Sequence, residues 1–264
     1  MATAHAGNDK DAKRRAAKAG AGVDDKPRRG KFSKLLLIIG ILLILAAAAI
    51  VGWLFWQHWQ NQQDYQSVQA VAGANQPVAG STAAKGKWNL DKTINWTALR
   101  KRNPEVVGWV VVPGTKINYP VVQSKNNQDY LHQNFDKQSS VYGCVFNDYQ
   151  GDPRLAGQVN IIYGHDMRDG SMFAGLNKFT DASYLAKHRT IWLFTPWMTY
   201  QLQANKCKKV YGSSTSFRSR LADPLDPGKP KEYDFVTCWA PDDSYRVAII
   251  STVINQKVPS NYVG

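Results

Sequence analysis

Cysteine is scarce in this chain of 264 residues, which contains only Cys144, Cys207 and Cys238. No two of them stand in a C-x-x-C spacing, so the sequence offers neither a paired zinc-ligand motif nor a dithiol redox motif. Histidine is also sparse, with five residues in the whole chain. These absences argue against a zinc or redox centre, and we expect neither a metal nor a cofactor.

Acidic residues are also few, with 20 Asp and Glu against 33 Lys and Arg, which gives a net charge of +13. Such a charge would suggest nucleic-acid binding if it were concentrated on a folded surface. Residues 1–34 alone contain ten basic and four acidic residues. The remaining positive charge is spread over the rest of the chain without a dense basic run, so we expect no nucleic-acid partner.

Charge is absent altogether from residues 35–56, "LLLIIGILLILAAAAIVGWLFW". At ~1.5 Å per residue, a helix over this run is roughly 33 Å long, enough to cross a hydrocarbon core of ~30 Å. The alternative is a signal peptide, whose apolar region would be shorter, about 7–15 residues. The basic residues before the run and the tryptophans at its end are typical of a membrane span with a cytoplasmic N-terminus. We predict a single-pass anchor in membrane lipid, with the C-terminal part extracellular.

Composition divides the chain into four parts. Residues 1–34 form a basic cytoplasmic tail, and residues 35–56 form the transmembrane anchor. Residues 57–86 are rich in Gln, Ala, Gly and Ser, which favours a helical stalk that becomes a flexible linker. Residues 87–264 remain, a length that suits one extracellular domain with its own core.

Short segments rich in β-branched and aromatic residues dominate this domain, and Gly, Pro, Asn and Asp separate them. Helical patterns are brief by comparison, at 94–103, 128–135 and 171–179. A mostly β domain with few helices favours a closed or nearly closed barrel over an alternating βαβ sheet. The predicted strands are 106–112, 117–123, 143–148, 158–164, 190–195, 198–211, 234–238 and 245–254.

One cysteine stands apart from the others. Cys238 follows an apolar strand, and Arg246 begins the next strand after the loop "WAPDD", so a hairpin would bring the two to one sheet edge. His165 ends the strand "VNIIYGH" and opens a loop, where side chains are commonly presented to a substrate. A thiolate at neutral pH needs a nearby cation or imidazolium, because the pKa of an ordinary thiol is ~8.5. Spacing alone leaves a structural role for each of these residues equally open.

Several motifs together resemble a known family. "INYPVVQ", "NNQDYLHQNF", "YGCVFND", "NIIYGHDMRDGSMFAGLNKF", "VTC" and "YR" follow one another in the order found in the sortases, most closely the class B sortases. The resemblance covers roughly residues 90–254. It implies an eight-stranded sortase-type β-barrel with short helices, behind one N-terminal transmembrane helix. It also implies a membrane-anchored cysteine transpeptidase of Gram-positive bacteria.

The resemblance assigns roles to individual residues. Cys238 would be the nucleophile that forms a thioacyl enzyme, His165 the acid and base, and Arg246 the oxyanion-stabilising residue. The expected partners are surface proteins or pilins with a C-terminal sorting signal, and an amine acceptor on a peptidoglycan precursor or a pilin lysine. The segment 211–233 would be the loop that shapes substrate choice, and its Pro, Gly and Ser content suggests a mobile cover. The expected substrate-binding residues are Asn127, Leu131 and Thr237.

The chain departs from the class B pattern at three places. Asp166 follows the histidine where Asn is common, Val236 stands near a position often held by Leu or Ser, and Trp239 follows the cysteine. None of these removes a catalytic group. Two alternatives remain open: another cell-wall acyl transferase or peptidase, such as an L,D-transpeptidase, and a non-enzymatic membrane-tethered binding module.

Overall fold

The structure, a computed structural model, describes residues 32–74, 88–212, 218–239, 242 and 244–262. Residues 1–31 of the expected basic tail and residues 75–86 of the stalk and linker expected at 57–86 lie outside the described residues. The chain forms two compact units, Met1–Trp56 and Gln57–Gly264. Helix α2 spans Phe32–Ala72 and contributes residues to both units.

The first unit contains the apolar part of α2. Within the described residues, one helix, Lys34–Ala72, is long and apolar enough to cross a membrane, with a mean hydropathy of 3.1 over its most apolar window. This length and composition are consistent with a membrane anchor or a signal sequence.

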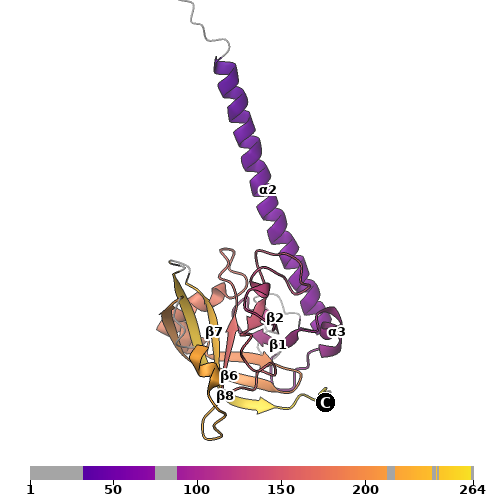
Figure 1. Cartoon of the computed structure of the whole chain (residues 1–264), viewed down its shortest axis with the longest axis vertical. Helices are drawn as coiled ribbons and strands as arrows, with labels where there is room; N and C mark the ends of the chain where they lie inside the picture. Colours follow the sequence, from indigo (N-terminus) through magenta and orange to yellow (C-terminus); the bar gives the residue numbers. More distant parts are fainter. Residues whose placement is uncertain (1–31, 75–87, 213–217, 240–241, 243, 263–264) are drawn as a thin grey trace, which may run out of the picture. The chain divides into compact units, whose positions relative to one another are not determined.

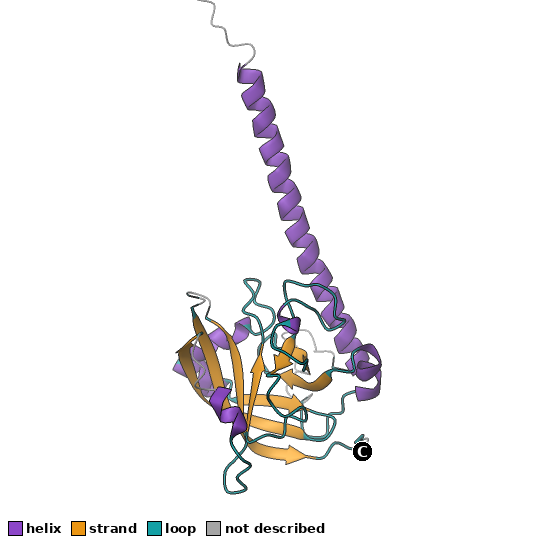
Figure 2. Cartoon of the chain, viewed as in Figure 1, coloured by secondary structure: helices purple, strands orange, loops and turns teal. Residues whose placement is uncertain are grey.

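The second unit is a closed barrel of eight strands in the order β1-β2-β3-β4-β7-β8-β6-β5 (Figures 1 and 2). Two neighbouring pairs are parallel, β2 with β3 and β4 with β7, and the other pairs are antiparallel. The prediction of an eight-stranded β-barrel with short helices is therefore confirmed. The strands are β1 Val106–Val111, β2 Asn118–Val122, β3 Val145–Asn147, β4 Val159–Tyr163, β5 Thr190–Phe194, β6 Thr199–Tyr211, β7 Glu232–Cys238 and β8 Tyr245–Lys257.

Alternation along the strands fills the barrel with apolar side chains. Phe235 on β7 and Val247 on β8 belong to the interior cluster, whereas Val236 and Ala248, one residue along each strand, belong to a separate cluster on the outer face. Successive side chains of a strand point to opposite faces of the sheet, which produces this division. Residues 234, 236 and 238 of β7 therefore share the outer face.

A second packed layer lies outside the barrel. Val68 and Ala72 of α2 pack with Trp96 and Leu99 of α3 (Trp96–Arg102) against the strands, around the buried Trp109 of β1. Asn95 caps α3, because its side chain accepts a hydrogen bond from the backbone N–H of Ala98 at 3.1 Å. The compact unit thus begins at residue 57, earlier than the boundary at residue 87 placed by composition.

The remaining helices are short. The segments expected to be helical at 128–135 and 171–179 contain η2 (Asp129–Leu131) and η3 (Ala174–Thr180). Two further helices, α4 (Ala182–Lys187) and η4 (Arg218–Ala222), were not predicted. Neither buries a residue fully, so neither carries the apolar periodicity that identifies a helix in a sequence.

Candidate active site

Cys238 and Arg246 are direct cross-strand partners. β7 and β8 pair antiparallel, and the last matched pair of the ladder is Cys238 with Arg246. Directly opposite residues project from the same face of a sheet, so the thiol and the guanidinium share the outer face. The Arg246 guanidinium donates to the backbone carbonyl of Tyr245 at 3.0 Å. An added Cβ at Gly212 would lie 3.1 Å from its Cζ, so glycine leaves room for the arginine there.

His165 lies at the same end of the barrel. β4 and β7 are parallel neighbours, with Tyr163 opposite Val236, and the backbone N–H of Gly164 donates to the Val236 carbonyl at 3.1 Å. His165 therefore follows the end of the strand that lies next to β7, at the same end of the barrel as Cys238. The sheet thus brings the strand ends that carry Cys238, Arg246 and His165 to one end of the barrel.

A backbone carbonyl orients the His165 ring. The Nε2 of His165 lies 2.8 Å from the carbonyl oxygen of Leu131, which ends η2. A carbonyl accepts a hydrogen bond, so this contact holds the proton on Nε2 and leaves Nδ1 as the nitrogen that exchanges a proton. The half-buried ring can thus act as a base at Nδ1 without losing its orientation.

Asn177 of η3 contacts both the backbone of Cys238 and the residue that follows His165. Its Nδ2 donates to the backbone carbonyl of Cys238 at 3.2 Å, and its side chain also hydrogen-bonds Asp166, the residue after the histidine. Burial raises the pKa of the Asp166 carboxyl, and the bond from Asn177 opposes that rise. Sequence reasoning missed Asn177 as a site residue, although it lies inside the motif that follows His165.

Comparisons with known proteins found similar sequences over about half of the chain. No family model matches the chain. Sortase B of Listeria monocytogenes is 38% identical over 119 residues, and sortase B of Staphylococcus aureus is 32% identical over 129 residues. These alignments cover 45% and 49% of this chain, and 47% and 53% of the relatives, so the chain matches about half the length of each.

Solved structures extend the likeness over the whole barrel. Sortase B from Bacillus anthracis in complex with AAEK1 superposes with a TM-score of 0.59 and 25% identity, covering 76% of this chain and 99% of that one. The chain is therefore similar to sortase B in sequence over about half its length and in fold over the barrel. The Staphylococcus aureus sortase B–substrate complex has the same fold, with a TM-score of 0.59 at 22% identity, covering 76% of this chain and 99% of that one.

The outer face of the barrel beside Cys238 is apolar, and a short helix packs against it. Ile161 of β4, Val236 of β7 and Ala248 of β8 form this apolar surface, and Leu221 of η4 packs against it. Two arginines anchor η4: Arg218 to Asp148 at 2.8 Å, and Arg220 to Asp234 at 2.5 Å and to Glu232. The segment predicted to be a mobile cover is thus held by ion pairs in its described part.

Asp148 connects η4 with β4 and with the segment before η2. It accepts hydrogen bonds from Arg218, from the Tyr163 hydroxyl at 2.9 Å and from the Asn127 amide at 3.0 Å. Burial alone would raise the pKa of its carboxyl, but these donors hold the pKa below its ordinary value. The Asn127 carbonyl oxygen in turn accepts from the Tyr149 backbone N–H at 3.0 Å.

The three expected substrate-binding residues occupy different environments. Leu131 touches the site through the carbonyl that binds His165, and Asn127 lies within the Asp148 network. The Thr237 side chain is buried on the interior face, one residue before Cys238. Their contact with substrate stays a prediction, and for Thr237 it would have to come from the backbone.

The other two thiols sit in apolar surroundings. Burial raises the pKa of the Cys144 thiol to about 12 and that of the Cys207 thiol to about 11. Trp239, the departure from the class B pattern next to Cys238, packs edge-on against Tyr245 with ring centroids 6.2 Å apart. The Lys209 ammonium lies over the Trp239 ring.

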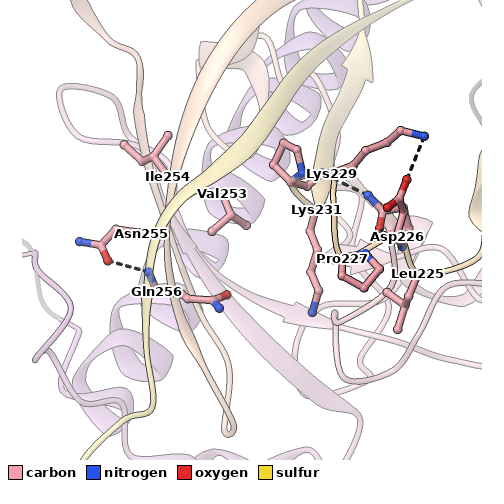
Figure 3. Close-up of a pocket in the computed structure, with 11 residues that line it drawn as sticks. Leu225, Asp226, Pro227, Lys229, Lys231, Val253, Ile254, Asn255 and Gln256 are labelled. Carbon is pink, nitrogen blue, oxygen red and sulfur yellow. Dashed lines mark hydrogen bonds and ion pairs between the residues drawn. The ribbon is translucent and has the colours of Figure 1, made fainter.

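A separate hollow of about 570 Å³ lies at the other end of β7, between β8 and the loop before β7 (Figure 3). Lys231 lines it immediately before β7 begins, and the seven residues of β7 separate it from Cys238 by about 20 Å. The hollow therefore does not belong to the site of the thiol. Its other lining residues include Leu225, Asp226, Pro227, Lys229, Val253, Ile254, Asn255 and Gln256.

Proposed function

We propose that this protein is a membrane-anchored cysteine transpeptidase that cleaves a C-terminal sorting signal and joins the acyl part to an amine. The observation that carries the proposal is the barrel register, in which Cys238 pairs with Arg246 and the strand that leads to His165 lies next to that of Cys238. The sequence similarity to two sortase B proteins over about half their length supports the same reaction.

The reaction has two halves. The Cys238 thiolate attacks the carbonyl carbon of the scissile Thr–X bond, and the C–N bond breaks as the His165 imidazolium protonates the leaving amine. The acceptor amine then attacks the thioester and passes its proton to His165, so that a new C–N bond forms and the C–S bond breaks. Arg246 stabilises the oxyanion of each tetrahedral intermediate.

The acceptor is the finer part of the proposal. A sortase B has been solved in complex with triglycine, at 22% identity to this chain, so this tripeptide is the first amine to test. We propose a glycine-type amine of a peptidoglycan precursor as the acceptor, and a pilin lysine is the alternative outcome. Water in place of the amine would give hydrolysis.

The test combines the full-length protein in detergent with a library of peptides carrying Thr–X sorting-type motifs, with and without triglycine. We expect a triglycine-dependent product from the wild-type protein, none from Cys238→Ala, and near-normal product from Cys207→Ala. Cys207 is the matched control because it is a half-buried thiol on a neighbouring part of the barrel. Product formation by Cys238→Ala would contradict the proposal.

Membrane topology is tested separately. The basic tail before the apolar run places the barrel outside the cytoplasm. Protease added to intact cells stripped of their wall should remove the barrel and spare residues 1–34. A barrel protected from the protease would overturn this orientation.

A further inference from the structure

The segment Gln57–Ala72 of α2 reaches the loop that follows His165. The Nδ1 of His58 lies 2.7 Å from the Oδ2 of Asp169 and 3.2 Å from the Tyr142 hydroxyl. On the other side of the ring, the Gln62 amide donates to the Nε2 of His58 at 2.7 Å. Because Nε2 accepts this bond, Nδ1 carries the proton that is donated to Asp169.

Asp169 transmits this contact to the loop of His165. Its Oδ1 accepts from the backbone N–H of Ser171 at 2.8 Å and from the Ser171 hydroxyl at 2.6 Å. The loop closes on the histidine itself, because the Phe173 N–H donates to the His165 carbonyl at 2.8 Å. Burial raises the pKa of the Asp169 carboxyl, but Ser171, His58 and Tyr142 together hold the pKa below its ordinary value.

A second contact from the same helix segment reaches the other side of His165. The buried Tyr65 donates from its hydroxyl to the carbonyl of Gly143 at 2.8 Å. Gly143 has a φ of +58°, and an added Cβ would lie 3.0 Å from the Cδ2 of His165 and 2.5 Å from the Tyr130 carbonyl. The Gly143 backbone therefore lies directly against the imidazole ring, and Tyr65 fixes the peptide that forms this side of the ring's pocket.

The two contacts converge on one group. His58 holds the loop on the C-terminal side of His165, and Tyr65 holds the backbone that lies against the ring, next to Tyr142, which His58 also contacts. We propose that Gln57–Ala72 is a positioning element for His165, with His58 and Tyr65 as positioning residues. This proposal rests on the transpeptidase function, because it assigns the two residues to proton transfer by His165.

The prediction is a loss in kcat with little change in KM. General acid–base catalysis contributes ~10²–10⁴-fold to a rate. An imidazole held out of position would therefore give a smaller rate enhancement. Tyr65→Phe and His58→Ala should each lower kcat by about 10-fold or more, with KM within about twofold. His58→Asn keeps an amide N–H near the position of Nδ1 and should restore most of the rate.

The control is Gln66→Ala, which changes an exposed residue on the same helix segment. All variants are measured as full-length protein in detergent, with thermal unfolding recorded beside the kinetics. Because Tyr65 is buried, Tyr65→Phe can also affect stability, and the His58→Ala and His58→Asn pair keeps the test decisive.

The outcomes separate three cases. A kcat loss in His58→Ala with unchanged unfolding temperature and recovery in His58→Asn supports the proposal. Wild-type kcat in both Tyr65→Phe and His58→Ala overturns it, and so does a loss that only follows the unfolded fraction. If the wild-type protein itself forms no transpeptidation product, the proposed function fails and the positioning role fails with it.

Discussion

Each end of β7 has an arginine beside it, and the two arginines have different partners. At its first residues, Glu232 and Asp234 accept ion pairs from Arg220, so the arginine holds η4 on the barrel. At its last residue, the arginine across the ladder faces a thiol, because Arg246 is the partner of Cys238. The same strand thus uses one arginine to fix a covering helix and another to build a reactive edge.

Two arginines beside the same strand therefore have different roles, which depend on where along the strand each one lies. The hollow of Figure 3 lies at the end with the ion pairs, whereas Cys238 and Arg246 pair at the other end, where the strand that leads to His165 also ends.

The largest effect is expected from Arg246→Lys. Lysine keeps the positive charge but loses the planar fork that can bind an oxyanion and a backbone carbonyl together. We expect kcat/KM to fall by ~10²-fold or more, on the scale of one lost oxyanion donor, while alkylation of Cys238 by a small electrophile persists. Arg220→Lys, the matched change at the other end, should keep kcat/KM within a few-fold. Equal losses of kcat/KM in the two variants would contradict the proposed difference between the two ends of β7.

The next effect is on stability. Arg220→Ala leaves Glu232 and the buried Asp234 without their cation. We expect the free energy of unfolding to fall by roughly 2 kcal/mol, less than the cost of breaking a fully buried pair, because Arg220 is about one-third exposed. Denaturant unfolding measures this change in the free energy of unfolding. A change below about 0.5 kcal/mol would mean that this end is held by packing alone.

A smaller effect concerns pH. Burial, together with the neighbouring charge of Glu232, raises the pKa of Asp234 from 3.8 to about 7. Between those pH values the folded protein retains a proton that the unfolded chain has lost, so this group makes stability fall as pH rises through that window. Asp234→Asn should therefore reduce the fall in unfolding temperature between pH 4 and 7. A variant whose pH dependence matches the wild-type protein would refute the assignment.

The smallest effect is expected at the remaining thiols. Cys144→Ala and Cys207→Ala remove thiols whose pKa values are raised by burial, so neither is a thiolate at neutral pH. Peptide cleavage should stay within a few-fold in both, with some loss of stability in Cys144→Ala because that site is fully buried. A loss as deep as that of Cys238→Ala would show that the nucleophile was chosen wrongly.

Much of the barrel was visible in the sequence, for a physical reason. Each strand carries β-branched and aromatic residues bounded by turn residues, so all eight were located to within a few residues. The edge that joins Cys238 to Arg246 was also predictable, because a short hairpin fixes which residues face each other.

The contacts made through the backbone could not be predicted. Leu131 reaches His165 by its carbonyl, and Gly143 lies against the ring because its φ is positive, and neither leaves a side-chain pattern in the sequence. The packing of residues 57–72 was hidden by their polar composition, since few of them, such as Tyr65 and Val68, are buried. Long-range pairs such as His58 with Asp169 have no local signal at all.

The most direct test of the account asks which thiol carries the acyl group. The full-length protein is mixed with a cleavable sorting-type peptide without an amine acceptor, quenched in acid, and analysed by intact and peptide mass spectrometry. We expect one acyl adduct, on Cys238, which disappears when triglycine is added. An adduct on Cys144 or Cys207, or cleavage by the Cys238→Ala protein, would contradict it.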